Sequence, residues 1–120
     1  IEVRYDPNSN PANNQVRVET LTPTGFPNSG WNTRLILNGV SFAAGDTLGA
    51  QAYSDGTVVV YKNGTPIGIV NVTLPTGSVA GWPAALASST SASRIGVWFI
   101  GVNSGSNDAR FDNFGGGTLP

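Results

Sequence analysis

Carboxylates are the main side chains of this 120-residue chain that could act as acids or bases, because the chain contains neither histidine nor cysteine. Hydrolysis of a glycosidic bond usually requires two carboxyl groups that face one cleft, ~5–9.5 Å apart. The two glutamates, Glu2 and Glu19, each lie on the polar side of an alternating stretch, and no tight acidic cluster is present. Composition also excludes a serine or cysteine nucleophile that a histidine activates. The sequence therefore indicates a protein that is not an enzyme.

Several oxygen donors of the kind that calcium prefers lie in or near expected loops. They are Asp6, Asn8, Asp46, Asp55, Asn107, Asp108 and Asp112. Their spacing does not match an EF-hand. Asp6, Asp55 and Asp108 are also good formers of Asx-turns, and Asp46 is placed to start a strand. A structural calcium ion held by Asp112, Asp6 and Asp108 is one expectation, and local turns are the alternative.

Asp112 differs from the other candidate ligands because it lies between two phenylalanines, in a segment expected to be a packed strand. A buried carboxylate needs a partner that compensates for the loss of water. The candidates are Arg110 or Arg94, backbone N–H groups, or a cation. The sequence does not choose among them.

The tryptophans indicate most directly where a ligand could bind. Trp98 lies inside an apolar stretch and is expected in the core, whereas Trp31 and Trp82 lie among Gly, Pro, Asn or Ser residues in segments predicted to be loops. A tryptophan exposed on a loop can stack on a sugar ring, while nearby Asn and Asp side chains bind hydroxyl groups. The predicted ligand-binding residues are Trp82, Trp31, Asn32 and Asp55. The alternative is that each tryptophan caps one end of the fold.

The elements that must position these residues are organised around a central hairpin. Its first strand, Thr57–Lys62, is β-branched and aromatic, which suits a pleated, packed surface. Asn63-Gly64 follows, and this pair tolerates positive φ at both central positions of a type I′ turn. Apolar residues occupy both faces of the strand, so we expect it to be covered on both sides.

Seven further segments have the composition of short strands, separated by turn-forming residues. They are Ile1–Tyr5, Gln15–Leu21, Arg34–Leu37, Asp46–Tyr53, Ile67–Leu74, Arg94–Val102 and Ala109–Phe114. A long loop is expected over Thr22–Asn32. The Ala84–Ala87 run can hold one helical turn but is too short to be a reliable helix. The pattern predicts an all-β fold, an antiparallel β-sandwich. Residues 1–114 are expected to form a single module, and residues 115–120 the start of a Gly-rich linker or tail.

The composition restricts the class of partner. Charged residues make up 11% of the chain, and six basic and seven acidic residues give a net charge of −1 with no basic run. Binding to nucleic acid depends on clustered Lys and Arg, so it is not expected. No apolar run is long enough to span a membrane. A cysteine-free chain rich in Asn, Thr and Gly is typical of extracellular modules, and its start at Ile1, inside a strand, suggests a mature product or an excised module.

Four motifs occur in an order that resembles a known superfamily. Gly45-Asp46-Thr47-Leu48 enters a strand, Val60-Tyr61-Lys62-Asn63-Gly64 forms the hairpin, Gly96-Val97-Trp98-Phe99 lies in a late strand, and Phe111-Asp112-Asn113-Phe114-Gly115-Gly116 closes the segment. Together, across about residues 45–116, these motifs resemble the concanavalin A-like lectin/glucanase superfamily, especially its laminin G-like members. The chain corresponds to the C-terminal two-thirds of such a domain. Either the N-terminal strands are abbreviated or a preceding segment completes the sandwich.

The resemblance implies a jelly-roll-like sandwich and, often, carbohydrate or adhesive ligands. The Glu-x-Asp-x-x-Glu pattern of the superfamily's glucanases is missing from this chain. The expected function is therefore that of a non-catalytic, extracellular carbohydrate-binding or adhesion module, with a polysaccharide or glycan as its partner. The alternative is a structural subunit or spacer, pilin-like or filament-forming, completed by a strand from another segment or chain.

Overall fold

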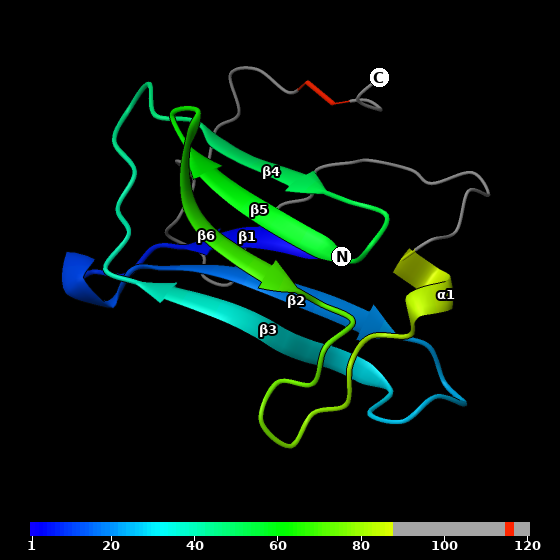
Figure 1. Cartoon of the computed structure of the whole chain (residues 1–120). Coiled ribbons are helices and arrows are strands. Elements are labelled where there is room, and N and C mark those ends of the chain that lie inside the picture. The colour runs from blue at the N-terminus through cyan, green and yellow to red at the C-terminus, as the bar shows by residue number, and fades with distance from the viewer. Residues whose placement is uncertain (88–114, 117–120) are drawn as a thin grey trace. The chain divides into compact units, whose positions relative to one another are not determined.

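A computed structural model describes residues 1–87 and 115–116 of the chain. Within them, six strands form two three-stranded antiparallel sheets, ordered β1-β2-β3 and β4-β5-β6 (Figure 1). The strands are β1 (Glu2–Asp6), β2 (Gln15–Thr22), β3 (Gly30–Asn38), β4 (Leu48–Ala52), β5 (Thr57–Lys62) and β6 (Thr65–Asn71). A 3-10 turn, η1 (Pro11–Asn13), and a single helical turn, α1 (Ala84–Ala87), complete the elements. The predicted all-β, antiparallel fold is confirmed.

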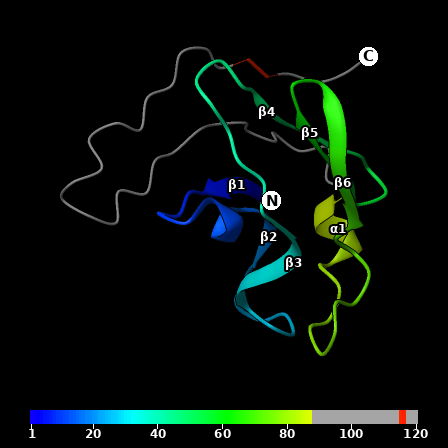
Figure 2. The ribbon, with the colours of Figure 1, turned by 90° about the vertical axis from the view of Figure 1, so that its left-hand side faces the viewer.

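The two sheets form separate layers that share one apolar core (Figure 2). Val16 and Val18 alternate along β2, Val58 and Val60 alternate along β5, and all four side chains are fully buried together with Val72. Side chains alternate between the two faces of a strand, so this spacing directs one face of each sheet inward. We call β1-β2-β3 the first sheet and β4-β5-β6 the second sheet.

The β5–β6 hairpin has the turn that its sequence predicts. Asn63 has a φ of 52° and Gly64 a φ of 75°, and Lys62 pairs with Thr65 across the two-residue loop. Positive φ at both central positions defines the type I′ geometry, which matches the twist of the two strands. The hairpin prediction is confirmed.

The outward face of β5 is less covered than its composition suggested. Val59 and Tyr61 are half-buried, and Ile69, the cross-strand partner of Val59, is 66% exposed. The Tyr61 hydroxyl donates to Gln51 Oε1 at 3.2 Å, across to β4. The expected complete cover therefore holds only for the core side of β5.

The boundaries of several strands differ from the expectation, most importantly in β3. This strand begins at Gly30 rather than Arg34, so Trp31 and Asn32 lie in a strand and the loop is confined to residues 23–29. The cause is a β-bulge opposite Val18 and Glu19, which inserts Arg34 as an extra residue and allows the ladder to continue to Thr22. β4 starts at Leu48 instead of Asp46, and β6 ends at Asn71 instead of Leu74.

Several predictions concern residues outside the described ranges. These are the strands Arg94–Val102 and Ala109–Phe114, the core position of Trp98, and the roles of Asp108 and Asp112. In the part of the chain that the structure describes, no helix has the length and apolar character needed to cross a membrane.

Candidate ligand-binding face

The first sheet carries a charged surface on the side opposite the core. Because Val16 and Val18 point inward, Arg17 and Glu19 project from the other side of β2. Arg4 of β1 lies directly opposite Arg17, an arrangement of like charges that destabilises a sheet unless it is compensated. We call this side of the first sheet the outer face.

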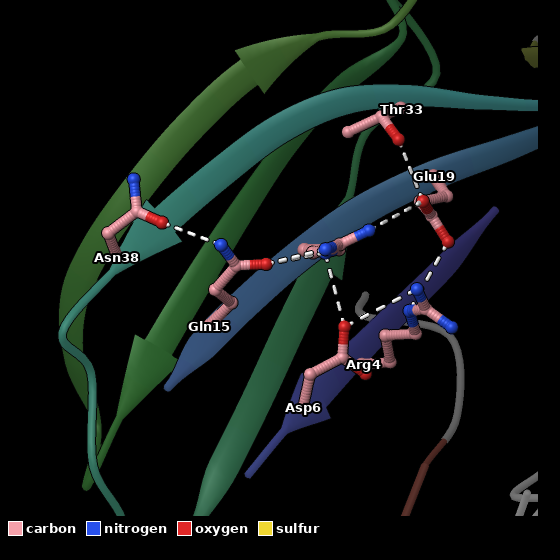
Figure 3. Close-up of polar contacts among 7 residues, drawn as sticks. Arg4, Asp6, Gln15, Glu19, Thr33 and Asn38 are labelled. Carbon is pink, nitrogen blue, oxygen red and sulfur yellow. Dashed lines mark hydrogen bonds and ion pairs between the residues drawn. The ribbon is translucent and has the colours of Figure 1, made fainter. Parts of the chain in front are cut away.

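Two carboxylates compensate the paired arginines. Asp6 Oδ2 lies 3.3 Å from Arg4 Nη2 and 3.1 Å from Arg17 Nε. Glu19 lies on the other side, with Oε2 at 3.3 Å from Arg4 Nε and Oε1 at 3.9 Å from Arg17 Nη1 (Figure 3). Each arginine thus contacts both acids, and each acid contacts both arginines.

Uncharged side chains extend this arrangement to β3. Gln15 Oε1 accepts hydrogen bonds from Arg17 Nε (2.9 Å) and Nη2 (2.6 Å), while Gln15 Nε2 donates to Asn38 Oδ1 at 2.8 Å. The Thr33 hydroxyl donates to Glu19 Oε1 at 2.8 Å. The outer-face network therefore spans all three strands and consists of Arg4, Asp6, Gln15, Arg17, Glu19, Thr33 and Asn38 (Figure 3).

Burial differs within the network. The side chains of Arg4, Asp6 and Arg17 are 30–35% exposed, whereas that of Glu19 is only 10% exposed. Arg4 Nε is buried and, although close to Glu19, has no hydrogen-bond partner among the described residues. Glu19 thus acts as the inner anchor of the network, and Asp6 lies at its accessible side.

An apolar platform lies at one end of the same outer face. Leu21 of β2 pairs with Trp31 of β3, two residues along β2 from Glu19 and therefore on the same side of the sheet. Leu21 is 49% exposed and Trp31 is 52% exposed. Trp31 is the most exposed tryptophan among the described residues, and it adjoins the polar network through Thr33.

Trp82 has a different environment from Trp31. Its indole Nε1 donates to the Leu21 carbonyl at 3.1 Å, its backbone N–H donates to the Val72 carbonyl at 2.7 Å, and its ring packs against the core. A Cβ on the preceding Gly81 would collide with the Thr73 carbonyl, so the chain fits closely there. This geometry is that of a tryptophan that caps the end of the sandwich, the alternative considered from the sequence.

The other two predicted ligand-binding residues are engaged in local structure. Asn32 Nδ2 donates to the carbonyls of Asn28 (2.6 Å) and Gly30 (3.0 Å), and Asn32 lies on the opposite face of β3 from its neighbour Trp31. Asp55 Oδ1 accepts from the Thr57 backbone N–H at 2.8 Å in the β4–β5 turn, and this hydrogen bond lowers the pKa of the Asp55 carboxyl. Trp82 thus contacts Leu21, the cross-strand partner of Trp31, but the four predicted residues do not share one face, because Asn32 faces away from Trp31 and Asp55 is held in a turn of the second sheet.

Of the three predicted calcium ligands, Asp6, Asp108 and Asp112, only Asp6 lies in the part of the chain that the structure describes. Its carboxylate contacts two arginines, which compensate its charge without a metal ion. Asp108 and Asp112 lie outside the described ranges, and within residues 1–87 and 115–116 no group of three acidic side chains is arranged to hold a metal.

Sequence reasoning missed most of the network. The signal was the alternation of charged residues along two neighbouring segments, which places Arg4 and Arg17 each on a polar face. Their association with Glu19 and Asp6 depends on the register between β1 and β2, which alternation alone does not specify.

The chain was compared with protein-family models, with curated proteins and with solved structures, and no match was found in any of the three comparisons.

Proposed function

We propose that the chain is a non-catalytic, extracellular carbohydrate-binding or adhesion module, and that it binds a glycan on the outer face of the first sheet. The observation that carries this proposal is the position of Trp31, half-exposed at the end of a polar network on the same face. The apolar side of a sugar ring stacks on an aromatic side chain, and its hydroxyl groups bond to planar polar groups such as Gln, Asn, Asp and Arg.

The network supports binding because its side chains are already held in place. Arg4 and Arg17 are fixed by ion pairs and Gln15 by three hydrogen bonds. Side chains that are ordered before binding lose little conformational entropy when a ligand arrives. From Leu21 to Gln15 the strand extends ~20 Å, which suits an oligosaccharide better than a single sugar.

The same acids are poor candidates for catalysis. Glycoside hydrolysis usually requires two carboxyl groups that face the substrate across one cleft. Asp6 and Glu19 instead each contact the guanidinium groups of Arg4 and Arg17. The resemblance of four sequence motifs to laminin G-like modules is compatible with a binding role, and both that kinship and the jelly-roll-like fold it implies are part of the proposal.

The test is affinity electrophoresis of the native chain through gels that contain a polysaccharide. We expect retardation by at least one polysaccharide, and Trp31→Ala should remove most of it while leaving Tm nearly unchanged, because Trp31 is half-exposed. Ile69→Ala is the matched control: it also removes an exposed apolar side chain, but from the second sheet.

Undiminished retardation of Trp31→Ala would refute the proposed platform. If no polysaccharide retards the native chain, the proposed function is wrong and the structural-subunit alternative gains support.

A further inference from the structure

Among the described residues, the side chains of the outer face do not leave a cation available for an acidic ligand. Arg4 and Arg17 supply two positive charges, while Asp6, Glu19 and Glu2, which pairs with Glu19 across the strands, supply three negative charges. The sum for these five residues is −1. We infer that the outer face selects uncharged saccharides and rejects glycans that carry sulfate or carboxylate groups; this inference rests on the proposed function.

The geometry gives the reason for this selectivity. Recognition of an anionic sugar uses a guanidinium group that can form a bidentate pair with sulfate or carboxylate. Both guanidinium groups here already lie within 4 Å of two carboxylates. An anionic ligand would have to displace one acid from its arginine or approach both acids closely, and like charges in that position oppose binding.

Other basic residues of the described chain do not offset this charge. Arg34 is buried on the core side, where it donates to Thr20 Oγ1 and to the Ala80 carbonyl. Lys62 contacts Asp46 and the Ser41 carbonyl near the β5–β6 turn of the second sheet. Among the described residues, therefore, every arginine on the outer face is paired with acids.

The outer face nevertheless retains groups that suit hydroxyls. Both arginines contact the same oxygen of Asp6, Oδ2, so its Oδ1 is the candidate acceptor for a sugar hydroxyl. Asn38 is exposed at the far end of the network and its amide can donate and accept. A sugar hydroxyl carries no charge, so these hydrogen bonds and the stacking on Trp31 do not depend on attraction between opposite charges and should change little with salt.

The experiment is affinity electrophoresis of the native chain against neutral polysaccharides (dextran, β-glucan, xyloglucan) and acidic ones (alginate, heparin), at ~50 and ~500 mM NaCl. We expect retardation by a neutral polysaccharide that is the same at both salt concentrations, and none by the acidic polysaccharides. Retardation of the native chain by alginate or heparin, lost at high salt, would overturn the inference but leave the proposed function standing. Retardation by none of the polysaccharides would overturn both.

A charge variant tests the cause of the selectivity. Asp6→Asn removes the charge of the more exposed of the two acids that bridge Arg4 and Arg17, so affinity for heparin at low salt should rise roughly tenfold or more. Asp55→Asn removes the same charge from the β4–β5 turn and should not produce this gain. Glu2→Gln, which removes a charge from the outer face without touching the Asp6 bridge, should give a smaller gain. No gain in either outer-face variant would contradict the electrostatic explanation.

Discussion

Among the described residues, Asp46 is the one whose protonation is most clearly linked to folding. Its carboxylate accepts from the Ala43 backbone N–H (2.9 Å) and from Asn63 Nδ2 (2.6 Å), and it lies 3.0 Å from Lys62 Nζ. These contacts, the backbone hydrogen bond first, lower the pKa of Asp46 from 3.8 to about 2. Since Asn63 Oδ1 also accepts from the Thr47 N–H, the carboxylate holds the segment before β4 against the β5–β6 turn.

This linkage predicts a specific acid sensitivity. The folded-state pKa lies below the unfolded value, so the stabilisation is complete above pH 3.8 and is lost as the pH falls through about 2. Asp46→Asn should be less stable than the native chain at pH 6, and the difference should shrink toward pH 2. Thermal unfolding of both proteins across this range measures the effect. A constant difference in Tm would mean that the Asp46 contacts do not depend on its charge.

Arg34 contrasts with the arginines of the outer face. It is 3% exposed, and its guanidinium donates to Thr20 Oγ1 (2.8 Å) and to the Ala80 carbonyl (2.8 Å); burial lowers the pKa of Arg34. Arg34→Ala leaves both acceptors without their donor and opens space in the fold, so it should cost about 2–4 kcal/mol of unfolding free energy.

The matched control for this prediction is Arg17→Ala. Arg17 is about 30% exposed, and pairs of this kind contribute about 0–1 kcal/mol. Chemical denaturation of the two variants compares them directly. Equal losses would show that burial of Arg34 does not set its contribution.

At the scale of the elements, the β5–β6 hairpin was predictable because its determinant is local. Two adjacent residues, Asn63 and Gly64, specify the turn, and the pairing of Lys62 with Thr65 follows from it. β3 was not predictable to the same extent. In the sequence, Gly30 before Trp31 indicates a loop. The bulge at Arg34 arises only when β2 and β3 pair. Because the extra residue shifts the alternation of side chains along β3, it determines that Trp31 faces outward.

The hairpin gives a prediction that isolates backbone conformation. Gly64 has a φ of 75°, and a Cβ added to it would meet no other atom within 4 Å, so Gly64→Ala introduces strain without a clash. Left-handed backbone costs a non-glycine residue about 1–2 kcal/mol, and the unfolding free energy should fall by that amount. Gly49→Ala is the control, because Gly49 lies in β4 without positive φ and with only an ordinary contact to Tyr61. An equal loss of unfolding free energy in Gly64→Ala and Gly49→Ala would show that the positive φ of Gly64 does not cause the loss.

At the scale of the whole molecule, composition and alternation were enough to predict two-layer β architecture. The buried valines of β2 and β5 alternate with polar or half-buried residues, which is the pattern of strands that contribute one face to a core. The candidate site was less predictable, because it is formed across strands. Trp31 was proposed because tryptophan can stack on a sugar and because a loop was expected there, but it lies in β3. Asp6 and Glu19 come together only through the register between β1 and β2, and Trp82, which looked similar to Trp31 in sequence, packs on the core.

The most direct test of the proposed binding face is an NMR titration of the 15N-labelled native chain with an oligosaccharide of the polysaccharide that retards it. The side-chain N–H signals report each candidate separately: the indoles of Trp31 and Trp82, the guanidinium Nε–H groups of Arg4 and Arg17, and the amides of Gln15 and Asn38. The outer-face account predicts shifts for Trp31 and the network, with Trp82 unmoved in its hydrogen bond to Leu21. Shifts centred on Trp82 or on the Asp55 turn, with Trp31 and the network unchanged, would contradict it.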